Sequence, residues 1–175
     1  MTQNRRLMRQ DFLDVMDVTW ARYVPTIIAL TEEDQARYAR AEGYNDIKEL
    51  IAHLSLRLQQ LLDVIPALAE GEAVTIPDED ANASHARAVE SARDQTLEQV
   101  AADFNSLQDA VAGMLGDLPD TAFERAPTYD WLYRTLIEHY QAHEPPGEPQ
   151  NPAAQHGGAR PAPGEHIMED NPPQP

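Results

Sequence analysis

Two histidines lie four residues apart in the last apolar segment, at His139 and His143. In an α-helix, residues four apart lie on one face, so both imidazoles can reach a single metal ion. Helical spacing also places them on one stripe with Leu132, Leu136 and Tyr140, which predicts that this face meets the core. Buried imidazoles need hydrogen-bond partners or a metal ion, because unpaired polar groups are costly inside a protein. The pair is therefore a candidate metal site.

A third histidine could complete such a site. His53 lies far upstream, at the edge of the apolar face of another helical segment. Three imidazoles leave at least one open position on a metal ion, an arrangement found in catalytic rather than structural centres. The alternative is that each is an ordinary histidine at the boundary of the core, held by hydrogen bonds. The sequence thus predicts His53, His139 and His143 as metal ligands, and it identifies no catalytic residue beyond them.

The other histidines are weaker candidates. His85 lies near the start of a third helical region and is expected to face solvent. His156 and His166 lie in a Pro-rich terminal stretch and are expected to be solvated. Tyr140 rather than a glutamate follows His139, which disfavours a zincin-type protease. The sequence contains no phosphate-binding loop, nucleophile elbow or dinucleotide fingerprint.

Composition and charge restrict the class of protein. Acidic residues outnumber basic ones by 30 to 13, for a net charge of −17, so nucleic acid and anionic membranes are not expected partners. The chain has no cysteine, which excludes disulfides, thiolate nucleophiles and Cys-based zinc sites. It has no signal-peptide core and no apolar run of about 18 residues. A soluble cytoplasmic protein is the expectation.

The spacing of apolar residues predicts helices throughout the first part of the chain. Four long helical regions are expected, at about 6–30, 46–68, 83–115 and from 127 to just before 145. Pro25 should kink the first region, because proline removes a helical hydrogen bond. Thr96 and Gln99 have the spacing of a capping box, at which the third region should bend or restart. These helices predict an all-α four-helix bundle over residues 1–144.

The last segment, residues 145–175, differs from the rest of the chain. It has nine prolines and four glycines in 31 residues and few large apolar side chains. Such a segment cannot bury enough apolar surface to offset its chain entropy. It is therefore expected to be a disordered tail.

Two segments resemble a known family. Gly43-Tyr-Asn-Asp-Ile-Lys-Glu-Leu-Ile-Ala-His53-Leu is similar to the Gly-Trp-Ser-x-Lys-Asp-Leu-x-x-His-Leu signature of DinB/YfiT-like four-helix proteins. The ending Leu136-Ile-Glu-His139-Tyr-Gln-Ala-His143 resembles a second signature of the family, His-Tyr-x-x-His. The resemblance covers about residues 6–144 and is greatest to the DfsB/ClbS-type branch. The chain departs from the usual Trp-Ser at Tyr44 and Asn45, and from a common aromatic position near Leu56 and Arg57.

The resemblance implies a fold, a cofactor and a range of activities. In this family a divalent ion, zinc or nickel, is typically held at positions that match His53, His139 and His143. Members include enzymes that use low-molecular-weight thiols, maleylpyruvate-type isomerases and a hydrolase that protects against a cyclopropane genotoxin, and they often form homodimers. The implied function is metal-dependent transfer or hydrolysis on a small electrophile, in stress or toxin resistance. The alternative is a non-catalytic bundle that binds a metal or ligand as a structural or interaction protein.

Overall fold

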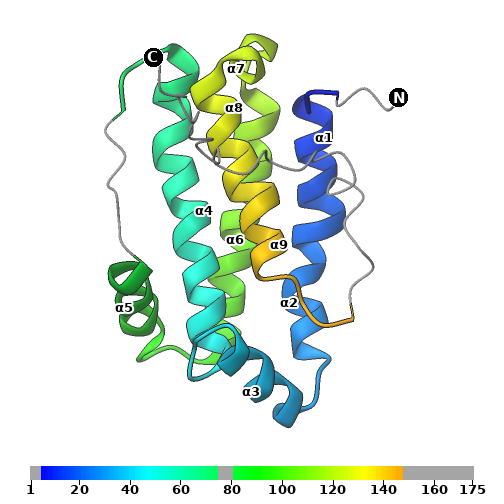
Figure 1. Ribbon diagram of the computed structural model, residues 1–175, viewed down its shortest axis with the longest axis vertical. Helices are drawn as coiled ribbons and strands as arrows, with labels where there is room; N and C mark the ends of the chain where they lie inside the picture. Colours follow the sequence, from blue (N-terminus) through cyan, green and yellow to red (C-terminus); the bar gives the residue numbers. More distant parts are fainter. Residues whose placement is uncertain (1–4, 75–80, 148–175) are drawn as a thin grey trace, which may run out of the picture.

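The computed structural model describes residues 5–74 and 81–147. Within these ranges the chain forms helices and no strand (Figure 1). The elements, in chain order, are α1 (Arg9–Asp14), η1 (Val15–Trp20), α2 (Ala21–Ile28), α3 (Glu32–Ala41), α4 (Ile47–Glu70), α5 (Ala81–Ala92), α6 (Leu97–Asp117), α7 (Asp120–Glu124), α8 (Ala126–Tyr133), η2 (Arg134–Glu138) and α9 (His139–Ala142).

Four long helical rods make up the bundle, which confirms the predicted fold. The first rod is α1, η1 and α2 in succession, the second is α4, the third is α6, and the fourth is α8, η2 and α9. In Figure 1 the rods run roughly parallel to the long axis of the molecule. The rod α4 packs against α6 and α8, and α1 and α2 pack against α6. Each rod therefore has an apolar face to bury, as its sequence predicts.

Aromatic side chains fill the centre of the bundle. Trp20, Tyr23, Phe104 and Tyr140 come from three rods and are 0–1% exposed. Their ring centroids lie 5.3–6.2 Å apart, within the range of favourable tilted and edge-to-face contacts. The Trp20 indole nitrogen donates a hydrogen bond to the Leu136 carbonyl oxygen at 3.0 Å, which ties the first rod to the fourth.

Two rods contain a π-helical turn that the apolar pattern does not reveal. The first, η1, precedes Pro25, which itself lies within α2. The departure from α-helical geometry is therefore one turn earlier than the kink expected at the proline. The second, η2, directly precedes His139, whose backbone N–H donates to the Arg134 carbonyl oxygen. Because a π turn holds more residues than an α turn, it changes the angular positions of the residues after it.

Side-chain caps begin three of the helices. Thr31 accepts a hydrogen bond from the Asp34 backbone at the start of α3, and Asp46 accepts one from the Glu49 backbone at the start of α4. Thr96 and Gln99 form the predicted capping box at the start of α6. The third helical region restarts here, so it consists of two helices, α5 and α6, and α5 packs on the outside of α4.

The chain contains one lysine, Lys48, and it holds the end of α5. Its Nζ donates to the carbonyl oxygens of Gln95 at 3.0 Å and Ala92 at 3.5 Å. The last carbonyl groups of a helix have no partners within the helix, so a cation stabilises them. Lys48 therefore fastens α5 to the first turn of α4.

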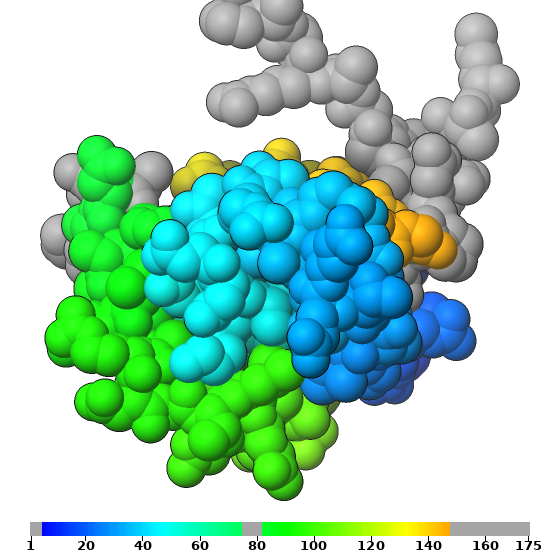
Figure 2. Space-filling view, turned by 90° about the horizontal axis from the view of Figure 1, so that it is seen from below, coloured from blue at the N-terminus to red at the C-terminus, as the bar shows by residue number. Residues whose placement is uncertain are grey.

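The end of the bundle beside α3 brings distant segments together. Figure 2 shows this end, where α3, the start of α4 and the last described residues lie side by side. Pro145 is buried there. The rest of the predicted tail, with His156 and His166, lies outside the described residues. No helix within the described ranges is long and apolar enough to span a membrane.

Candidate metal centre

The three predicted ligands come together between α4 and the end of the fourth rod. His53 lies on the second turn of α4 and is 6% exposed. His139 begins α9, and His143 is the residue that ends it; both are half-buried. One nitrogen from each ring lies within 4.8 Å of the other two. Among the described residues, this is the only group of three or more His, Asp or Glu side chains close enough to share an ion.

The spacing of the rings fits one metal ion. Their centroids are 5.0 Å apart for His53 and His139, 5.2 Å for His53 and His143, and 4.8 Å for His139 and His143. Three imidazoles bound to one tetrahedral ion have ligand nitrogens about 3.3 Å apart. To hold one ion, the rings would move inward by rotation of their side chains.

Hydrogen bonds hold two of the rings from outside the cluster. The Nδ1 atom of His143 lies 2.6 Å from Oε2 of Glu42, the residue at the end of α3. An ionised carboxylate only accepts hydrogen bonds, so the Nδ1–H of His143 donates to Glu42. The Ser84 hydroxyl lies 3.5 Å from His53 Nδ1, at the limit of a hydrogen bond. Partners of this kind orient histidine ligands in metal sites.

The third ring contains an unsatisfied buried atom. His139 Nε2 is enclosed and has no hydrogen-bond partner. Leaving a buried ring nitrogen unpaired costs free energy, and a metal ion is the partner that three converging imidazoles can share. The donor set and this orphaned atom both fit a bound divalent ion.

Burial keeps two of the three imidazoles neutral. It is the main cause that lowers the pKa of His53 to about 3 and that of His139 to about 2. A neutral imidazole is the form that binds a metal ion. At neutral pH these two side chains therefore need no deprotonation before they bind a metal.

Tyrosines anchor the last turn of the fourth rod. The Tyr38 hydroxyl donates to the His143 carbonyl oxygen at 2.5 Å. The Tyr23 and Tyr38 hydroxyl oxygens are 2.9 Å apart, and burial raises the pKa of both groups. Both phenols thus remain protonated at neutral pH. The chain fixes the backbone at His143 as well as its side chain.

One prediction about the surroundings is corrected. His85 is half-buried rather than directed to solvent, because it stacks on Tyr44 with a centroid distance of 4.7 Å and an angle of 24°. Tyr44 in turn lies 5.5 Å from the His53 ring. Burial raises the pKa of Tyr44 to about 12, so its hydroxyl stays protonated. His85 and Tyr44 thus form an aromatic wall beside the centre.

Sequence reasoning missed three side chains around the cluster. Glu42 and Ser84 reach it from other helices, and no local pattern marks either of them. Tyr44 lies in the segment that resembles the family signature, so its position could have marked it. These residues became recognisable only when the helices were placed next to one another.

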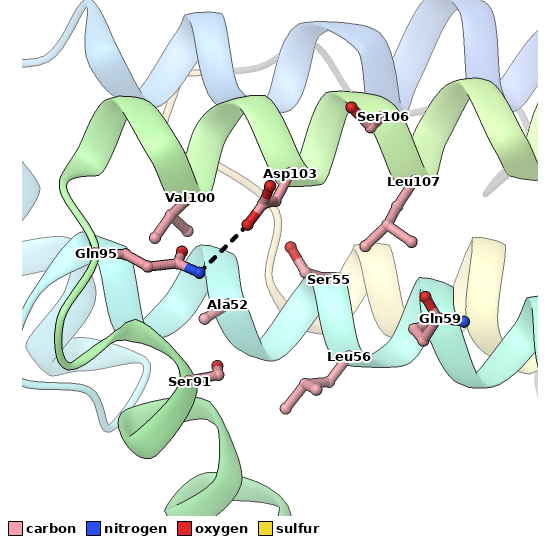
Figure 3. A pocket seen from close by; sticks show the side chains of 10 residues that line it. All are labelled: Ala52, Ser55, Leu56, Gln59, Ser91, Gln95, Val100, Asp103, Ser106 and Leu107. Carbon is pink, nitrogen blue, oxygen red and sulfur yellow. Dashed lines mark hydrogen bonds between the residues drawn. The ribbon is translucent and has the colours of Figure 1, made fainter.

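A separate groove lies between α4, α5 and α6 (Figure 3). It has a volume of about 410 Å³. Its serine hydroxyls already donate to carbonyl oxygens of their own helices, and Gln95 donates to Asp103 at 3.3 Å. Polar groups that are satisfied in this way present few free donors to a ligand. The three-histidine cluster is therefore the stronger candidate for a functional site.

Comparison with known proteins identifies a family. No curated protein and no solved structure matches the chain significantly. A family profile, that of the DinB superfamily, matches residues 16–157. This range includes all three histidines and runs past residue 144, where the predicted domain ends. Because the match covers most of the chain, this protein belongs to the DinB superfamily.

Proposed function

We propose that this protein binds a divalent cation through His53, His139 and His143 and uses it as an enzyme. The observation that carries the proposal is the convergence of three imidazoles from two rods, one with an unpaired buried nitrogen. Imidazole ligands suit zinc and nickel, which are the ions we propose. Three protein ligands leave a position for a substrate, as in catalytic centres.

The proposed chemistry is transfer or hydrolysis on a small electrophile. A bound divalent ion would supply a Lewis acid that favours the deprotonated form of water or of a thiol at neutral pH. The protein's part is to hold the rings, keep two of them neutral and limit access of water through the wall of Tyr44 and His85. The chain has no cysteine. If the nucleophile is a thiolate, it must come from a low-molecular-weight thiol.

We further propose a place beside the DfsB/ClbS-type branch, on the motif segments around His53 and His139. This placement would connect the enzyme with stress or toxin resistance in the cytoplasm. It would also make a homodimer the expected assembly. These finer assignments rest on the sequence resemblance alone.

The first test is metal analysis of protein produced without a histidine tag. After treatment with chelator and incubation with zinc or nickel, the wild type should retain about one ion per chain. His53→Ala and His139→Ala should retain almost none, because each removes one of three ligands. His85→Ala is the matched control, since His85 lies beside the cluster without belonging to it, and it should bind as the wild type does. A wild type that retains no ion would overturn the proposal.

The second test separates an enzyme from a binding protein. The metal-loaded protein is incubated with small electrophiles and a panel of low-molecular-weight thiols, and product formation is followed by mass spectrometry. Turnover that His139→Ala abolishes supports the enzyme. Metal retention without turnover on any member of the panel supports the alternative, a non-catalytic metal- or ligand-binding bundle.

A further inference from the structure

A cationic side chain adjoins the three-histidine cluster. Arg57 follows His53 by four residues on α4, so both side chains leave the same face of the helix one turn apart. Arg57 is half-buried, and its Nε is enclosed without a hydrogen-bond partner. Its Nη1 donates to the neutral side chain of Gln60 at 3.1 Å. The remaining donors of the guanidinium have no partner among the described residues.

The helix that carries His53 also places Arg57 near the cluster. The His53 ring lies against His139 and His143, with centroid distances of 5.0 and 5.2 Å. Because residues four apart share one face of a helix, Arg57 leaves α4 on the side that faces the centre.

Arg57 lacks a carboxylate partner within the described ranges, although the chain has 30 acidic residues and 13 basic ones. Other arginines do have such partners, in the pairs Arg5–Asp11, Arg9–Asp120, Arg37–Asp34 and Arg93–Glu90. Partial burial of a cation without an anion is unfavourable, because the charge loses hydration and gains no ion pair. In a chain this acidic, a half-buried arginine without a carboxylate is available for an external anion.

We propose that Arg57 binds the carboxylate of a small molecule whose reacting atom is held at the His53–His139–His143 centre. This inference rests on the proposed metal-dependent function and narrows its substrate class to small carboxylic acids. A guanidinium matches a carboxylate with two parallel hydrogen bonds. Arg57 and His53 leave one face of α4 a single turn apart, so one small molecule can reach both.

The test uses cobalt(II) as a spectroscopic substitute for the native ion, with two thiols of the same length. One probe is 3-mercaptopropionate, and the other is its neutral analogue 3-mercaptopropan-1-ol. A thiolate that binds cobalt produces strong near-ultraviolet absorption, so each probe can be titrated without any turnover. The wild type should bind the acid about tenfold or more tightly than the alcohol, because a charge-assisted bidentate pair adds to the thiolate contact.

Three variants identify the source of that preference. Arg57→Met should bind both probes with equal affinity. Arg57→Lys should keep a weaker preference for the acid, because lysine retains the charge but cannot donate two parallel hydrogen bonds to one carboxylate. Arg22→Met is the matched control: it removes one positive charge from an exposed position on α2, and it should keep the full preference. Circular dichroism and cobalt stoichiometry show that each variant is folded and loaded.

The outcomes separate this inference from the proposed function. Equal affinity for acid and alcohol in a cobalt-loaded wild type, or no binding of either, overturns the role of Arg57 and leaves the metal centre intact. An acid preference that survives in Arg57→Met also overturns it. A wild type that takes up no cobalt overturns the metal centre itself, and the role of Arg57 fails with it.

Discussion

The Nδ1 atom of His143 lies 2.6 Å from Oε2 of Glu42, although the two residues are 101 positions apart in the chain. This contact joins the end of the fourth rod to the end of α3. It orients the ring of His143 at the cluster. The carboxylate of Glu42 thereby links the position of α3 to the orientation of a candidate metal ligand.

The contact predicts a role for Glu42 in metal affinity. Glu42→Gln should weaken zinc or nickel binding about 10- to 100-fold, because the neutral amide supports the protonated Nδ1 less strongly. Competition with a chromophoric chelator measures the change. Glu33→Gln, at an exposed position on the same helix, should leave affinity unaltered. If Glu42→Gln binds metal as tightly as the wild type, Glu42 does not support the ligand.

The lowered pKa values predict how the stability of the metal-free protein depends on pH. His53 and His139 have folded pKa values of about 3 and 2, below the unfolded value of about 6.5, so folding favours their neutral forms. Their contribution is fully present above about pH 6.5 and is lost as pH falls toward 3, because only the unfolded chain takes up protons in that range. Each group changes the free energy of unfolding by at most about 1.4 kcal/mol per pH unit.

Urea unfolding of chelator-treated protein at pH 7, 6 and 5 tests this dependence. His139→Gln cannot titrate, so its stability should fall less steeply with decreasing pH than that of the wild type. Gln141→Ala, at an exposed position on the same helix, should keep the wild-type slope. Equal slopes for His139→Gln and the wild type would show that His139 is not held neutral by burial.

Lys48 is predicted to hold α5 against α4. Lys48→Met should lower the free energy of unfolding by about 1 kcal/mol, because the carbonyl groups of Ala92, at the end of α5, and of Gln95, in the connection after it, lose a charged donor. Amide hydrogen exchange should become faster in α5 and remain unchanged in α6. Arg93→Met removes an exposed ion pair with Glu90 on α5 and should change stability by a few tenths of a kcal/mol at most. Unchanged exchange in α5 would contradict the predicted role of Lys48.

Truncation tests where the folded domain ends. A chain that stops after Gly147 should melt within about 2 °C of the full-length protein, since the removed segment is Pro-rich and has few large apolar residues. A chain that stops after Glu144 should melt at a lower temperature, because it loses the buried Pro145 next to the site. Differential scanning calorimetry measures both. If the chain that stops after Gly147 melts many degrees below the full-length protein, residues 148–175 contribute to the stability of the fold.

The order of helices follows from local sequence information. Caps at Thr31, Asp46 and Thr96 and the periodic apolar stripes are short-range signals, so the positions of the rods could be predicted from them. The restart before α6 was visible in the capping box. The π turn η2 could not be predicted in this way, because no local motif in the sequence marks it.

The sequence by itself determined the candidate ligands. His139 and His143 are neighbours on one helix, and their spacing alone predicted that they could share an ion. His53 was a third candidate from the edge of another apolar face, and the resemblance to a family pattern supported its assignment to the same site. Residue type and local spacing thus identified the chemistry available to the chain.

Only the tertiary structure decided what surrounds that chemistry. Glu42, Ser84 and Tyr44 meet the histidines because α3, α5 and the fourth rod pack around the start of α4. Such contacts join residues that are far apart in the chain. The spacing of residues in the sequence does not tell how far apart two separate helices lie in the folded protein. The same packing buries His53 and His139, which lowers their pKa values and leaves the guanidinium of Arg57 beside them. Burial and charge at a site arise from the assembled bundle, because each depends on every helix that excludes water from it.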